Sequence, residues 1–106
     1  MEVKARSGER RLLLELKGEL DHHGAKDVML RLERELDTAL PLQLVLDFGG
    51  VSFMDSSGIA VVLRAQRRMA ALGGSVTVQR VGAQAKKVFD AAGISRLVAI
   101  RREGEK

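Results

Sequence analysis

The sequence has no cysteine, no tryptophan and no tyrosine, and only one proline in 106 residues. Without cysteine it can form neither disulfides nor thiolate metal sites, which fits a reducing compartment. With three phenylalanines as its only aromatic residues besides histidine, its core must be mainly aliphatic. No apolar run approaches the roughly 18 residues of a membrane-spanning helix, and residues 1–6 lack the apolar stretch of a signal peptide. We therefore expect a cytoplasmic protein that does not enter a membrane, with one domain over residues 1–106.

The charge is positive but dispersed. The net charge is +4, and eighteen basic residues are scattered among fourteen acidic ones. Since no aromatic side chains accompany the basic ones, direct nucleic-acid binding is not expected. Arg64, Arg67 and Arg68 have the spacing of one helical face, which predicts either a solvated surface or a contact with an acidic protein partner.

Hydrophobic periodicity predicts an alternation of strands and helices. Strands are expected over residues 3–6, 11–17, 42–48, around 76–78 and over 97–100. Helices are expected over residues 25–39, 59–72 and 83–92, with a polar connection at 18–24 and a frayed charged tail after residue 100. The order β-β-α-β-α-β-α-β indicates an α/β fold with a mixed, mostly parallel sheet and right-handed crossovers. Because the strands alternate in polarity, the helices should lie mainly on one face of the sheet.

A strand-to-helix junction stands out at residues 51–58, which read Val-Ser-Phe-Met-Asp-Ser-Ser-Gly. Asp55, Ser56 and Ser57 all favour helix starts, and the free amides and dipole of a helix amino terminus favour negative charge. Such a junction can cap the helix or present a hydroxyl for modification. Asp55 can cap the helix or contact a partner. The residues alone do not choose between the two serines.

The sequence does not predict an enzyme. The serines lack the Gly-x-Ser-x-Gly pattern of a nucleophile elbow, and neither glycine-rich nucleotide-binding pattern occurs. His22 and His23 are adjacent, so their side chains diverge, and no third ligand stands at metal-binding spacing. We expect neither a metal site nor a cofactor.

Three segments carry a family resemblance. They are residues 18–23 (Gly-Glu-Leu-Asp-His-His), 52–59 (Ser-Phe-Met-Asp-Ser-Ser-Gly-Ile) and 85–93 (Ala-Lys-Lys-Val-Phe-Asp-Ala-Ala-Gly). Together they resemble the anti-sigma factor antagonists of the STAS-domain family, most closely the sporulation antagonists of the sigma-F pathway. The resemblance covers nearly the whole chain and implies the STAS fold.

The resemblance also implies a mechanism. In the family, the unmodified antagonist binds an anti-sigma factor that is also a serine kinase, and thereby releases a sigma factor. The kinase phosphorylates the first serine of Asp-Ser-Ser-Gly, here Ser56, and a serine phosphatase reverses the modification. Asp21 matches an acidic position beside the acceptor. With Asp55, Ser57 and Gly58 it is expected to belong to the partner-binding surface of a monomer.

Other interpretations remain open. The chain could be another STAS phospho-switch, such as a general-stress antagonist or a sensor scaffold subunit, or a non-regulatory interaction domain whose serines only cap. Gly24 replaces a threonine that is frequent in the family, and Gly82-Ala83 replaces Ser-Pro. Each change removes a capping group worth about 0.5–1 kcal/mol.

Overall fold

The computed structural model describes residues 1–104 and contains one five-stranded sheet with three α-helices. The elements are β1 Glu2–Gly8, β2 Arg11–Leu20, α1 His22–Ala39, β3 Gln43–Met54, α2 Ser56–Ala71, β4 Ser75–Val81, α3 Ala83–Ala92, a 3₁₀ turn Ile94–Arg96 and β5 Ala99–Arg102. The sheet order is β1-β2-β3-β4-β5, with β1 antiparallel to β2 and the other neighbours parallel. The predicted element order and mixed sheet are confirmed.

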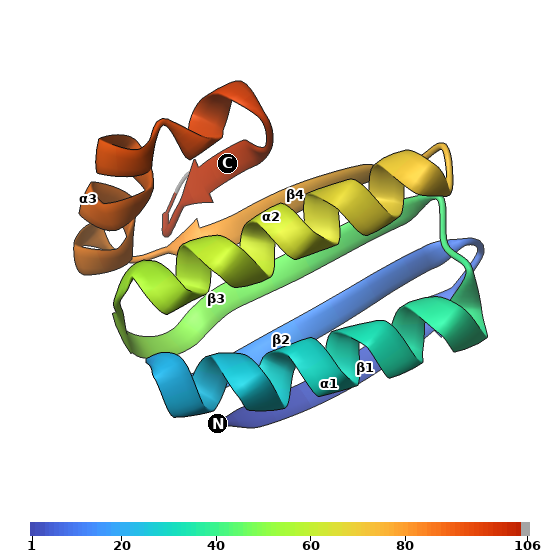
Figure 1. Ribbon diagram of the computed structural model, residues 1–106, viewed down its shortest axis with the longest axis horizontal. Helices are drawn as coiled ribbons and strands as arrows, with labels where there is room; N and C mark the ends of the chain where they lie inside the picture. Colours follow the sequence, from blue (N-terminus) through green and yellow to red (C-terminus); the bar gives the residue numbers. More distant parts are fainter. Residues whose placement is uncertain (105–106) are drawn as a thin grey trace.

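The helices cover one face of this sheet, as predicted. Figure 1 shows α1 and α2 side by side across it, with α3 beside the start of α2. The inward-facing strand residues are almost wholly aliphatic and fully or nearly fully buried: Leu12, Leu14 and Leu16 on β2, Leu44 and Leu46 on β3, and Val76 and Val78 on β4. Phe48 and Phe89, whose ring centroids lie 5.6 Å apart, pack α3 against β3. No helix within residues 1–104 combines the length and the apolar character needed to cross a bilayer.

The polar connection predicted over residues 18–24 is wrong. β2 continues to Leu20, which is fully buried, and α1 begins at His22. Gly18 has φ of +119°, and irregularities in the pairing with β3 let the strand run on through this polar segment. The helix starts before residue 25 because Asp21 caps it.

Other boundaries also differ from the predictions. β3 extends to Met54 rather than ending at residue 48, and α2 begins at Ser56 rather than at residue 59, because Asp55 caps it. The last strand spans Ala99–Arg102, after the 3₁₀ turn, so part of the expected frayed tail is a strand. Residues 105–106 of that tail lie outside the described residues.

The predicted basic face of Arg64, Arg67 and Arg68 is largely neutralised within the fold. Arg64 Nε lies 2.7 Å from Glu33 Oε1, and Arg68 contacts both Glu33 and Asp37 of α1. These pairs join α1 to α2, a contact between helices that the spacing along one helix could not reveal. Arg67 alone of the three is left exposed outside this network.

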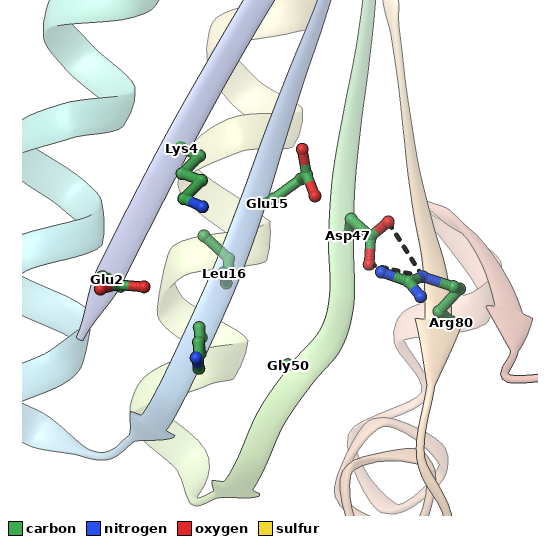
Figure 2. A pocket seen from close by; sticks show the side chains of 8 residues that line it. Glu2, Lys4, Glu15, Leu16, Asp47, Gly50 and Arg80 are labelled. Atoms are coloured by element: carbon green, nitrogen blue, oxygen red, sulfur yellow. Dashed lines mark hydrogen bonds and ion pairs between the residues drawn. The ribbon is translucent and has the colours of Figure 1, made fainter.

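The face of the sheet opposite the helices contains a buried charge, Asp47, which is 5% exposed. Its carboxylate accepts hydrogen bonds from Gly49 N at 2.8 Å and from Gln79 Nε2 and Arg80 Nε at 3.0 Å each. Figure 2 shows the Arg80 guanidinium directed at this carboxylate, beside a hollow of about 160 Å³. Arg80 has φ of +54°, and its guanidinium fills the space that a side chain at Gly49 would need.

These contacts make Asp47 a source of acid-sensitive stability. Burial raises the pKa of Asp47, but the hydrogen bonds from Gly49, Gln79 and Arg80 outweigh it, so the pKa lies below its usual value. A carboxyl whose pKa is lowered by folding stabilises the protein above its unfolded pKa of about 3.9. This stabilisation is lost as the pH falls through the folded pKa.

Asp47→Asn is therefore expected to lower the free energy of unfolding by about 1–2 kcal/mol near neutral pH, allowing for the half-exposed Arg80. Below pH ~3.9 the difference between variant and parent should shrink. Urea denaturation of both proteins over a pH series measures this. Equal stability near neutral pH, or a difference that does not vary with pH, would contradict the role assigned to Asp47.

Candidate functional site

The site predicted around Asp55 lies at the edge of the sheet where β2 and β3 both end. Leu20 and Met54 are register partners at these ends, and Asp55 N donates to Leu20 O at 3.3 Å. A single residue then joins each strand to its helix: Asp21 before α1 and Asp55 before α2. The tertiary structure thus brings Asp21 and Asp55, far apart in sequence, to neighbouring helix starts.

Both aspartates are N-caps. Asp21 Oδ1 accepts from Gly24 N and Asp55 Oδ1 accepts from Ser57 N, each at 2.8 Å. The hydrogen bond from Gly24 is the main reason that the pKa of Asp21 is lowered. The capping alternative stated for Asp55 is therefore realised, and Asp21 caps α1 in the same way. Two carboxylates still stand at this edge, so any group placed there meets negative charge as well as helix amino termini.

The two serines of α2 face different surfaces. Ser56, the first residue of α2, is exposed and lines a hollow of about 440 Å³ between α2 and α3. Ser57 is half-buried and lines a hollow of about 460 Å³ between α1 and α2. A modification at either hydroxyl would therefore act on a different neighbourhood. Sequence spacing alone could not separate them.

Gly58 is buried beneath this surface. A side chain at this position would collide with Met54 and press against Leu20, at the ends of β3 and β2. The absence of a Cβ lets the first turn of α2 pack directly on these strand ends. Gly58 therefore contributes to the site by placing Ser56 and Ser57, because its own surface is covered.

Exposed apolar side chains flank the serines, and the sequence analysis did not identify them. Leu30 on α1 is 71% exposed and lines the α1–α2 hollow with Met29. Phe53, two residues before Asp55, is 43% exposed. Leu30 does not belong to the row of buried residues by which α1 packs against the sheet. An apolar residue outside that row was the sequence signal that could have indicated an exposed apolar surface. A contiguous exposed apolar patch marks an interaction site when it is large enough, whereas a single exposed apolar side chain is common on protein surfaces.

Gln84 was also missed. Its side-chain amide donates to Met54 O at 2.7 Å and accepts from Met54 N at 2.8 Å. Met54 is buried and ends β3, so this two-point contact fixes α3 against the strand end that leads into Asp55. No motif indicates such a contact, because it joins residues thirty positions apart.

The described part of the chain brings no set of metal ligands together. His22 and His23 are exposed, with their ring centroids 5.9 Å apart in an edge contact. Among residues 1–104 there is no group of three or more His, Cys, Asp or Glu side chains arranged to hold a metal ion.

Comparison with known proteins gives consistent matches. Over 89 residues the chain is 29% identical to the "Anti-sigma F factor antagonist" of Paenibacillus polymyxa, covering 84% of this chain and 76% of the relative. The anti-sigma factor antagonist SpoIIAA in its unphosphorylated form superposes with a TM-score of 0.73 at 23% identity, over 98% of this chain and 90% of that one. The Bacillus cell fate determinant SpoIIAA in its phosphorylated form gives 0.72 at 24% identity, over 93% and 90%.

The STAS domain model matches residues 1–105. The predicted resemblance is thereby confirmed, and the fold agrees with that of the solved relatives. This chain belongs to the STAS domain family.

Proposed function

We propose that this protein is an anti-sigma factor antagonist. Its unphosphorylated form binds an anti-sigma factor that is also a serine kinase, and this binding releases a sigma factor. The curated relatives that match most of the chain bear the name anti-sigma F factor antagonist, which supports a role in the sporulation pathway. The STAS family is regulatory, and the protein serves as a substrate and binding module rather than as a catalyst.

Ser56 is the proposed phosphate acceptor. The observation that carries this assignment is its position: it is the exposed first residue of α2, whereas the neighbouring Ser57 is half-buried. A kinase needs the hydroxyl to reach its own active site, so the exposed serine is the better substrate. The structure of the phosphorylated relative shows that a protein of this fold accepts a phosphate.

The proposed partner surface surrounds this serine. It comprises Asp21, Asp55 and Ser57 at the surface, with Gly58 beneath them. The apolar Leu30 extends it across the α1–α2 hollow, where its exposed area would be covered by the partner. The antagonist is proposed to act as a cytoplasmic monomer of one STAS domain, without contacting nucleic acid. A serine phosphatase restores its active form.

The acceptor is tested by labelling three single variants with ATP and the kinase recovered from the native cell by pull-down. Ser56→Ala is expected to abolish phosphate incorporation while retaining kinase binding, because only one hydroxyl is lost at an exposed position. Ser57→Ala and the control Ser52→Ala should still be labelled. Mass spectrometry of the parent should find one phosphate on Ser56.

Two results would overturn the assignment: labelling that survives Ser56→Ala, or labelling lost in Ser57→Ala alone. Identification of the pulled-down partner decides between the sigma-F pathway and a general-stress pathway or sensor scaffold. A chain that carries no phosphate and captures no kinase would instead be a non-regulatory interaction domain.

A further inference from the structure

Resting on the proposed function, we propose that Lys87 binds the phosphate on Ser56, across the hollow between α2 and α3. Ser56 and Lys87 line this hollow together with the apolar side chains Ile59, Val88, Ala91 and Ala92. A phosphate on Ser56 and an ammonium on Lys87 would meet over an apolar floor. The modified protein would then present an ion pair where the unmodified one presents an open apolar hollow.

Lys87 is available for this role, whereas its neighbour is not. Lys86 Nζ lies 2.5 Å from Asp90 Oδ1, in an ion pair along α3. Lys87 is exposed and forms no ion pair within residues 1–104. An unpaired, flexible ammonium beside a new dianion is attracted to it without first breaking another contact.

The other charges near Ser56 are negative, so a cation there would stabilise a phosphate. Asp55 caps the same helix and Asp21 caps the neighbouring one, so the phosphate enters a region that already holds two carboxylates. On the α1 side, Lys26 and His22 line the other hollow, with Ser57. Lys87 is therefore the basic side chain that shares a hollow with Ser56.

The fold fixes the start of α3, which carries Lys87, relative to the start of α2, which carries Ser56. Gln84, three residues before Lys87, is hydrogen-bonded through both amide atoms to Met54, two residues before Ser56. Helix α3 is thus fixed against the strand end that positions the serine. The phosphate and the ammonium would therefore meet across a hollow whose two sides are tied together by the fold.

The test uses the full chain with phosphoserine genetically encoded at position 56, and measures the second pKa of the phosphate by ³¹P NMR titration. That pKa, normally near ~6, should be about 0.2–0.7 units lower in the parent than in Lys87→Gln, the range for an exposed ion pair. The difference should shrink at high salt. Lys86→Gln is the matched control and should behave as the parent.

Equal pKa values in the parent and Lys87→Gln would overturn the proposal, as would an equal shift in Lys86→Gln. Because the phosphoserine is introduced during synthesis, the titration does not depend on the kinase. A negative titration therefore counts against Lys87 alone, whereas a failure of the kinase to label Ser56 counts against the proposed function.

Discussion

A chain that carries phosphoserine at position 56 is expected to bind the anti-sigma factor kinase more than a hundredfold more weakly than the unmodified chain, with its fold unchanged. The phosphate adds about −1.5 to −2 charges. Within the isolated protein it stands at the first residue of α2, where the helix dipole favours an anion by up to ~1–2 kcal/mol. The fold should therefore tolerate the modification.

At the proposed partner surface the same phosphate would be unfavourable. It would lose water as the proposed partner closes over Ser56, and burying a charge that one ammonium, that of Lys87, compensates only in part costs several kcal/mol. A loss of ~3–4 kcal/mol corresponds to more than a hundredfold in affinity. Asp21 and Asp55 add to the effect, because the modification concentrates negative charge at one edge of the sheet. The switch would be local electrostatics rather than refolding.

Titration of both forms with the kinase, together with amide chemical shifts, tests this expectation. Shift changes should be confined to the starts of α1 and α2 and to the facing side of α3. Phosphoserine encoded at position 7, an exposed residue of β1 at the opposite edge of the sheet, is the control and should bind like the parent. Undiminished binding of the form modified at position 56, or shift changes spread across the sheet, would contradict the mechanism.

The second large effect concerns stability. Gly24→Ala is expected to destabilise the protein, although alanine has a higher helix propensity than glycine. Gly24 lies in the first turn of α1, where alanine would normally be favoured by up to ~1 kcal/mol. Here the added Cβ would overlap the carbonyl oxygen of Glu19, a backbone atom that cannot rotate away. Either the helix start or the end of β2 must shift, and overpacking of this kind costs about 1–3 kcal/mol.

Thermal denaturation followed by circular dichroism measures this cost. A loss of about 1–3 kcal/mol corresponds to a fall in Tm of roughly 5–20 °C for a domain of this size. Gly8→Ala is the matched control, since nothing lies within 4 Å of the added Cβ and the backbone is extended. It should leave Tm unchanged or slightly raised. A Gly24→Ala variant as stable as the parent would show that α1 can move away from β2 at little cost.

The interpretation of Gly24 from the sequence was wrong. The sequence analysis interpreted it as a lost capping group, relative to the threonine frequent at this position in the family. In the structure the helix begins at His22, three residues before the predicted start, and Asp21 supplies the cap. The glycine instead permits close packing of helix and strand. Its role depends on a contact with the end of β2, which no local pattern encodes.

The sequence by itself determined the order of the elements, the mixed sheet and the side that carries the helices. Helix α3 was predicted with its observed bounds, because its apolar spacing is regular and Gly93 ends it in the left-handed conformation. The strand-to-helix junction was recognised as well, since Asp55, Ser56 and Ser57 form a local helix-start signal. Such features depend on residues a few positions apart, and periodicity and capping report them directly.

Only the tertiary structure decided how the site is surrounded. It placed Asp21 beside Asp55, turned Ser56 toward α3 and Ser57 toward α1, and fixed α3 by the contact of Gln84 with Met54. It also used Arg64 and Arg68 to join two helices, although their spacing had predicted either a solvated surface or a contact with an acidic partner. Each of these features joins residues roughly thirty positions apart, and such contacts arise only when the sheet has brought its strands and helices together.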